Sequence, residues 1–351
     1  MKKITLLLLF TFSATFAQNR REAEALVNQG IPYHDKGDFE GAIDKYDKAL
    51  LIDKDNLLAL TEKALTLNAM KKYPDAIAVS KQAIQAHQGE NLREVYVSYG
   101  NALDNSGKTD ESLKIYDEAL VLFPDYYQLH FNKGVTLSSI KRFDEAVRCF
   151  QNAIKIKPLH GSSLNAIGIL EMNNNRIASI LAFSRLAMVE PSSARAEKAL
   201  EVMQSLMIQG VSQTGKKTIS INIDSAVLSD TTATGSKKEN NFSSTDLILS
   251  LTASQDLDKK HKNDSKAEKF IRKFEVICSS LQETKKNNIG IYWEQFVPYF
   301  TEMNTKKLIE PFAYLIFSAS GDNDAEKWVN KNKRKVELLQ YWSDNYNWNK
   351  Q

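Results

Sequence analysis

The sequence predicts an all-α protein: about five helical hairpins stacked into a superhelical solenoid, a capping helix, a linker and a small helical C-terminal domain. Equivalent small residues are separated by 34 positions, as Ala42 is from Ala76 and Gly100 is from Gly134. Between them, apolar residues recur every three or four positions, which is typical of amphipathic helices. A fixed period of this length predicts a repeat architecture, because a single hairpin cannot bury its apolar faces without a neighbour.

The first seventeen residues have the pattern of a secretory signal peptide. Lys2 and Lys3 precede an apolar run at 4–12, and Thr15-Phe16-Ala17 supplies small residues for cleavage, which we predict before Gln18. The run is about half as long as the roughly 20 apolar residues of a membrane-spanning helix. No cysteine lies near the site for lipid attachment. We therefore expect export to the periplasm or secretion, with no integral membrane segment after cleavage.

Each predicted unit is a pair of amphipathic helices joined by a short polar turn. In the first unit, Gly30 and Tyr33 share a face of the first helix, and Ala42, Tyr46 and Ala49 share a face of the second. The small residues allow close helix contact, while the tyrosines are expected to fill the space between successive turns. The predicted units span residues 23–56, 57–92, 93–126, 127–160 and 161–191, and the capping helix spans residues 193–209.

This pattern resembles the tetratricopeptide repeat (TPR) over residues 21–210. The resemblance is carried by glycines of the first helix, small and aromatic residues of the second helix, and closing prolines. These are Gly30, Gly100, Gly134 and Gly168; Ala42, Ala76 and Ala146; Tyr46, Tyr116 and Phe150; Ala49, Ala83, Ala119 and Ala153; and Pro124 and Pro158. The second unit departs from the pattern with Ala64 and Ser80, and the fifth unit departs with Glu171 and Leu186. The fifth unit is therefore predicted to be a degenerate, capping-type repeat.

The resemblance implies a scaffold that binds other proteins in a concave groove lined by the first helices. Transferring the family's groove positions to this sequence selects Asn28, Ile31, His34, Thr61, Leu65, Asn68, Asn101, Asp104, Asn105, Phe131, Asn132, Val135, Asn165, Ile169 and Met172. A carboxamide both donates and accepts hydrogen bonds, so the asparagines suit the backbone of an extended peptide, while Phe131 and Ile169 suit an apolar side chain. The alternative is that these asparagines only solvate an exposed surface. The paired Lys and Arg by which chaperone-docking TPR proteins clamp a C-terminal carboxylate are absent, so that ligand class is not expected.

The composition changes after Gly210. Residues 211–265 are rich in Ser, Thr, Lys and Asn, which predicts a partly disordered linker with one short strand near Ile219 and a short helix at 245–253. Helical periodicity returns in residues 266–351, which contain all four tryptophans: Trp293, Trp328, Trp342 and Trp348. Because a small domain must bury large side chains, these aromatic residues favour a core over a sugar- or peptide-binding platform.

The sequence contains no convincing nucleotide, metal or catalytic motif. Residues 210–216 begin like a phosphate-binding loop, but Lys217 stands where a hydroxyl is required, and the stretch follows a helix instead of a strand. No histidine has a partner at zinc-ligand spacing, and a formal charge of +3 gives little general attraction to nucleic acid. We expect a protein or peptide partner, with no cofactor, metal or nucleic acid. The alternative is an enzyme with a catalytic C-terminal domain, in which Glu294 and Glu310 would be the carboxylates to inspect.

The two cysteines leave two alternatives open. Cys149 and Cys278 lie far apart in the sequence, so an oxidising compartment permits a disulfide between them. Two separate, partly buried thiols are equally compatible with the sequence.

Overall fold

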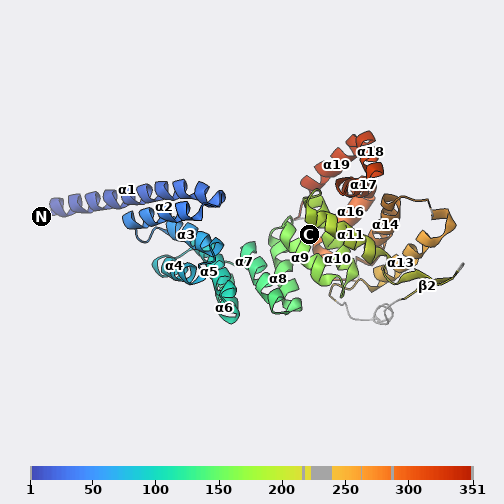
Figure 1. Ribbon diagram of the computed structural model, residues 1–351, viewed down its shortest axis with the longest axis horizontal. Helices are drawn as coiled ribbons and strands as arrows, with labels where there is room; N and C mark the ends of the chain where they lie inside the picture. Colours follow the sequence, from blue (N-terminus) through green and yellow to red (C-terminus); the bar gives the residue numbers. More distant parts are fainter. Residues whose placement is uncertain (1, 216–217, 223–238, 262, 286–287, 349–351) are drawn as a thin grey trace. The chain divides into compact units, whose positions relative to one another are not determined.

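The computed structural model describes residues 2–215, 218–222, 239–261, 263–285 and 288–348. Helices dominate these residues, which confirms the predicted all-α class (Figure 1). The chain divides into two compact units, residues 1–149 and 150–351, and each is described by itself below. In the described part of the chain, no helix combines the length and the apolar character needed to cross a membrane.

The first unit consists of helical hairpins, and its second, third and fourth hairpins begin at residues 57, 93 and 127, as predicted, whereas the first begins at Lys2, ahead of the predicted first repeat at 23–56. Helix α1 (Lys2–Asp35) packs against α2 (Phe39–Ile52), α3 (Leu57–Ala69) against α4 (Tyr73–Ala86), and α5 (Arg93–Asn105) against α6 (Thr109–Leu122). The 3-10 turn η1 (Glu90–Leu92) precedes α5, at the insertion that lengthens the second repeat by two residues. Helices α7 (Tyr127–Ser139) and α8 (Phe143–Ile156) follow, and the division between the units falls within α8. The predicted cleavage site before Gln18 lies inside α1.

Polar side chains and glycines set the helix starts in this unit. The side chain of Asp38 accepts a hydrogen bond from the amide of Gly41 at the start of α2, and that of Asn56 accepts one from Ala59 at the start of α3. Such caps satisfy amides that have no partner within the helix. Gly107, in the turn between α5 and α6, has φ +83°, a conformation in which most side chains are strained.

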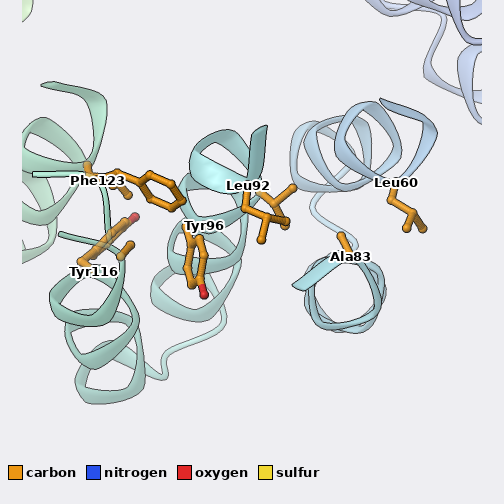
Figure 2. Packing of buried hydrophobic residues seen from close by; sticks show 9 residues of the cluster. Leu60, Ala83, Leu92, Tyr96, Tyr116 and Phe123 are labelled. Carbon is orange, nitrogen blue, oxygen red and sulfur yellow. The ribbon is translucent and has the colours of Figure 1, made fainter. Parts of the chain in front are cut away.

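Glycine on the first helix leaves room for an aromatic ring from the second. A Cβ atom on Gly100 would lie 2.4 Å from Cζ of Tyr116, and one on Gly30 would lie 2.5 Å from Cε1 of Tyr46. Both tyrosines are fully buried. Figure 2 shows Tyr116 packed in the core that joins the second and third hairpins, with Leu60, Ala83, Leu92, Tyr96 and Phe123. The glycine is therefore required because the ring occupies the volume that a side chain would need.

The two departures in the second repeat compensate for each other. Ser80 replaces the aromatic residue and Ala64 replaces the glycine, and both are fully buried. A small residue on the second helix thus leaves space for a methyl group on the first. The small residues predicted to line the helix contacts are confirmed as fully buried: Ala42, Ala49, Ala76, Ala83, Ala119, Ala146 and Ala153.

Tyr33 does not fill the space between turns as predicted, since its side chain is 41% exposed. It belongs to the last turn of α1, and a Cβ atom added to Gly41 would be 2.7 Å from its Cδ1. Tyr33 therefore covers the start of α2 from the solvent side, and only Tyr46 occupies the interior as expected.

The second unit contains the fifth hairpin and the C-terminal helices. The hairpin is α9 (Gly161–Glu171) with α10 (Arg176–Val189), and the predicted capping helix is α11 (Ala194–Ile208). The later helices are α13 (Ser243–Ser254), α14 (Lys266–Thr284), α15 (Ile291–Gln295), α16 (Val297–Thr305), α17 (Ile309–Ala319), α18 (Asn323–Lys331) and α19 (Lys333–Asp344). Both α10 and α11 contact α13 and α17. The predicted boundary near residue 210 is therefore not a division between compact units. The reason is that α10 is buried on all sides from Ile177 to Ala187 and needs cover from several helices.

The segment predicted as a linker forms secondary structure in much of the part that the structure describes, although only α13 buries several residues. Strands β1 (Val211–Gln213) and β2 (Ile219–Ile221) form an antiparallel hairpin, where the sequence predicted one strand. Helix α13 buries Leu249 and Ala253, and the 3-10 turns η2 (Gln255–Leu257) and η3 (Lys259–His261) follow it. The stretch that begins like a phosphate-binding loop forms β1 and its turn, with Lys216 and Lys217 outside the described residues. The predicted disorder falls partly on residues 223–238, which also lie outside them.

Many of the C-terminal aromatic residues form a core, as predicted, but Trp328, Trp342 and Trp348 are half-buried and Tyr341 is 70% exposed. Trp293, Phe296 and Phe300 are each at most 4% exposed. Both cysteines are free and buried, which decides between the two alternatives for this structure. Burial raises the pKa of the Cys149 and Cys278 thiols, so little reactive thiolate is expected at neutral pH.

Candidate functional site

The first helices of successive hairpins form one layer in the first unit. Helix α1 contacts α3, α3 contacts α5, and α5 contacts α7, whereas α2, α4 and α6 contact first helices more closely than one another (Figure 1). Closer spacing on one side of a stack places that side on the inside of its curvature. This first-helix layer is the surface that the sequence predicted as the ligand-binding face.

Large apolar side chains recur at one exposed position of this layer. Leu65 on α3 and Val135 on α7 are each 45% exposed. Ile31 and Asn101 hold the equivalent position in the first and third repeats and are half-buried. Ile169 is the equivalent residue of α9 and is 48% exposed, but it belongs to the second unit. The repeat period therefore aligns apolar residues on the solvent side of the first helices.

One helical turn further along, polar side chains connect neighbouring first helices. His34 Nδ1 shares a hydrogen bond of 2.7 Å with Thr66 Oγ1. Asn68 Nδ2 donates to the backbone oxygen of Ser98 at 2.9 Å. Thr136 Oγ1 donates to Asp104 Oδ2 at 2.8 Å. We refer to these three contacts as the inter-repeat bonds, because each joins consecutive repeats of the first unit.

Asn68 and Asp104, two of the residues predicted to contact a ligand, thus form hydrogen bonds within the protein. Asn68 also donates to the backbone oxygen of Ala64, and its Oδ1 is buried. Asp104 accepts from Thr109 Oγ1 at 2.9 Å as well as from Thr136, so both of its carboxylate oxygens are bonded. These side chains stabilise the spacing of the repeats, and contact of either one with a ligand stays a prediction.

Asn101 is held at the centre of the layer. Its Oδ1 accepts a hydrogen bond of 2.7 Å from the hydroxyl of Tyr116. Burial, and then the nearby Asp104 carboxylate, raise the pKa of Tyr116, so the hydroxyl stays protonated and donates. This bond directs Asn101 Nδ2 away from Tyr116 as a donor for other groups.

The remaining predicted residues are dispersed. Asn28 and Asn105 are exposed, Phe131 is half-buried, and Asn132 donates to the backbone oxygen of Gln128 in its own helix at 2.8 Å. Asn165 is half-buried on α9 and belongs, like Ile169, to the second unit. Within the first unit, the structure therefore brings together Leu65, Asn68, Asn101 and Asp104 on α3 and α5, with Phe131 and Val135 on α7.

Sequence reasoning missed the hydroxyl partners of the inter-repeat bonds. Thr66 and Thr136 occupy the same repeat position, two repeats apart, and both are nearly fully buried. A buried hydroxyl requires a hydrogen-bond partner. Their recurrence at one position is the signal that would have indicated a polar contact between repeats.

The bond between Thr136 and Asp104 should be measurable as a coupling energy. We expect Asp104→Ala and Thr136→Val each to lower the free energy of unfolding by about 1 kcal/mol, and the double variant to cost about 1 kcal/mol less than their sum. Denaturant unfolding followed by far-UV circular dichroism measures these values. Asp110→Ala, at an exposed site, is the control for loss of a carboxylate. Strictly additive effects would show that the two side chains do not interact in solution.

The carboxylates named for a C-terminal enzyme do not converge. Glu294 lines a cavity of about 590 Å³ in the second unit together with Glu302, Trp293 and Trp342. Glu302 accepts a hydrogen bond of 2.8 Å from Trp342 Nε1. Glu310 does not line that cavity and is paired with Lys335 at 2.7 Å. The cleft joining Glu294 and Glu310 that the enzyme alternative called for is therefore not found among the described residues.

Two stretches of the chain match family models described as tetratricopeptide repeat. One match covers residues 25–60 and the other covers residues 99–160. Together they include the first-helix layer at α1, α5 and α7. The matches therefore support the repeat positions that were read from the sequence.

Curated relatives and solved structures are similar to parts of the chain. The STIP1 homolog of Dictyostelium discoideum is 31% identical over 93 residues, which is 24% of this chain and 16% of that protein. Hsp70-Hsp90 organizing protein 1 of Glycine max is 32% identical over 98 residues, 27% of this chain and 17% of that protein. The chain thus spans less than a fifth of either relative. A crystal structure of MamA has a TM-score of 0.40 at 23% identity, covering 49% of this chain and 94% of that one. The TPR protein TTC0263 of Thermus thermophilus has a TM-score of 0.45 at 14% identity, covering 52% and 98%.

Proposed function

We propose that this chain, which matches tetratricopeptide-repeat models over residues 25–60 and 99–160, acts as a protein-interaction scaffold whose first-helix layer in residues 17–149 binds an extended peptide. The observation that carries this proposal is the alignment of exposed Leu65 and Val135 with Asn101 between them in the repeat series. Isolated exposed apolar residues are common on proteins. A row at one repeat position on the inner layer is more specific, because it presents regularly spaced contacts to a chain lying across the helices.

The proposed binding combines apolar contacts with a hydrogen bond to the peptide backbone. Leu65 and Val135 bury part of their exposed area against apolar side chains of the peptide, which contributes roughly 1 kcal/mol each when about half of a side chain is covered. Asn101 Nδ2 donates to a backbone oxygen, and the Tyr116 hydroxyl holds the carboxamide in place. A micromolar affinity requires about −8 kcal/mol in total, so these three side chains supply only part of the binding free energy.

The proposal is tested by peptide selection against a matched pair of variants. Peptides are selected from a random library on the full chain, and their affinities are measured for Leu65→Ser/Val135→Ser and for Leu51→Ser/Val121→Ser. The control pair lies on the second helices α2 and α6 and is even more exposed, at 86% and 82%. We expect at least tenfold weaker binding for the first pair and unchanged binding for the second. Equal affinities for both pairs would contradict binding on the first-helix layer.

Asn101→Ala separates the polar contact from the apolar ones. We expect this variant to weaken the selected peptides about threefold to tenfold, as for loss of one hydrogen bond. Asn91→Ala is the control, because Asn91 is exposed in the 3-10 turn η1 and is not among the residues predicted to line the groove. Unfolding curves for each variant verify that its fold is retained.

We also propose that the chain acts in a bacterial cell envelope after export. The support is the sequence pattern of Lys2, Lys3 and the apolar run before Ala17. Expression in a bacterial host, followed by cell fractionation and mass spectrometry of the N-terminus, tests it. The expected product is an exported chain that begins at Gln18. A cytoplasmic chain that retains residues 1–17 would contradict the proposal.

A further inference from the structure

A cavity of about 320 Å³ lies within the second unit, between α11, β1, the end of α13 with η2, and the first turns of α14. Its apolar lining comes from Met207, Ile208, Val211, Leu257 and Phe270. The volume is at the lower end of the range for small-molecule sites, roughly 300–1,000 Å³. The cavity is therefore large enough for a short apolar chain.

One side of this cavity is lined by ammonium groups. Lys266, Lys269 and Lys273 all border it and share one face of α14, at intervals of three and four residues. Asp256 is the only carboxylate among the residues that line it. Three positive charges and one negative charge leave a net charge of +2 on the lining.

The carboxylate of Asp256 is already paired with two cationic side chains. Its two oxygens accept hydrogen bonds from Lys273 Nζ and from Arg272, whose guanidinium also pairs with Asp264 at 2.5 Å. The side chain of Lys273 is only 5% exposed, and burial lowers its pKa. Lys273 is therefore a buried cation whose charge is balanced by Asp256.

Lys269 has no such balance. In the described part of the chain its ammonium group forms neither a hydrogen bond nor an ion pair, and the residue is half-buried at the cavity. Lys266 also lacks an ion pair, but it borders a second cavity that contains Glu197, Glu201 and Asp322. Lys269 is thus a lining lysine whose ammonium group is available to pair with a ligand, and Lys266 lines the same cavity. Positive charge beside an apolar wall attracts an anion that carries an apolar group.

We propose that this cavity binds a single-chain carboxylate amphiphile of the medium-chain fatty-acid class. The carboxylate pairs with Lys269 and Lys266, and the alkyl chain packs against Met207, Val211 and Phe270. The site lies in the second unit and is independent of the peptide-binding proposal for the first. Each methylene that becomes buried is expected to raise the affinity about fourfold.

Calorimetric titration of the full chain with decanoate below its micelle concentration tests the proposal. Hexanoate and decyltrimethylammonium are the comparison ligands for chain length and for head-group charge. We expect decanoate to bind, hexanoate to bind at least tenfold more weakly, and the cationic amphiphile not to bind. Equal binding of decanoate and decyltrimethylammonium, or no heat with decanoate, would overturn the proposal.

Two variants test the assigned residues. Lys269→Gln is expected to weaken decanoate about tenfold, whereas Lys259→Gln removes the same charge from η3, outside the cavity, and should leave the affinity unchanged. Val211→Phe fills the apolar side of the cavity and should weaken decanoate while leaving Lys269 in place. Thermal unfolding verifies the fold of each variant. An equal loss of affinity in Lys259→Gln and Lys269→Gln would assign binding to general surface charge and refute the site.

Discussion

Gly100→Val is expected to lower the free energy of unfolding of the first unit by about 4 kcal/mol. Even a single added carbon would lie 2.4 Å from Cζ of Tyr116, well inside van der Waals contact. The Tyr116 ring is fully buried and its hydroxyl is bonded to Asn101, so it has no open space to move into. Valine adds two further carbons at this point of helix contact, and the two helices of the third hairpin must separate.

Denaturant unfolding followed by far-UV circular dichroism measures the loss. Ala78→Val is the matched control, because Ala78 is exposed in the middle of α4, and there valine should cost at most about 0.7 kcal/mol in helix propensity. Gly100→Val/Tyr116→Ala should cost at least about 1 kcal/mol less than the two single variants added together, since the valine then occupies volume vacated by the ring. A small loss for Gly100→Val, close to that of the control, would show that the hairpin does not depend on this contact.

The repeat architecture was predictable because its determinants are local and periodic. Small residues such as Ala42 and Ala76 mark close helix contacts, and the period places the starts of α3, α5, α7 and α9. The compensation between Ala64 and Ser80 follows the same logic, although the two substitutions look like independent departures in the sequence. A pattern that must be satisfied in every unit is therefore readable without coordinates.

The candidate site was less predictable because its polar contacts join residues in different repeats. The sequence identifies Asn68 and Asp104 as first-helix residues, but Asp104 bonds to Thr136, 32 residues away, and only the spacing of neighbouring helices decides this. The division of the chain was also hidden, because the burial of α10 depends on contacts with α13 and α17 from distant sequence. The apolar row of Leu65 and Val135, by contrast, follows directly from the period.

The largest effect in the second unit is expected at Arg185, a fully buried residue of α10. Its guanidinium lies against two aromatic rings, with its central carbon 4.0 Å from the Tyr299 centroid and 4.2 Å from the Trp348 centroid. No carboxylate of the described residues pairs with it, and burial lowers the pKa of Arg185. Stacking on the two rings is therefore the main compensation for a large cost of desolvation.

Two substitutions separate the packing of Arg185 from its charge. Arg185→Ala removes the stacked group and leaves a cavity, so we expect it to lower the free energy of unfolding by about 3–4 kcal/mol. Arg185→Met keeps most of the volume and the contact with the rings but has no charge to desolvate, so it should remain within about 1 kcal/mol of the wild type or exceed it. Tryptophan fluorescence follows the unfolding of this unit, because all four tryptophans lie between residues 293 and 348.

Arg195→Ala provides the control for loss of an arginine in the same unit. Arg195 is partly exposed and paired with Glu190 at 2.7 Å, and such pairs contribute at most about 1 kcal/mol. If Arg185→Met is as unstable as Arg185→Ala, the positive charge itself holds Tyr299 and Trp348 in place. If Arg185→Met is as stable as the wild type, folding requires the volume of the Arg185 side chain but not its positive charge. The presence of a buried positive charge at Arg185, despite its desolvation cost, would then indicate a role for this residue other than stabilising the fold.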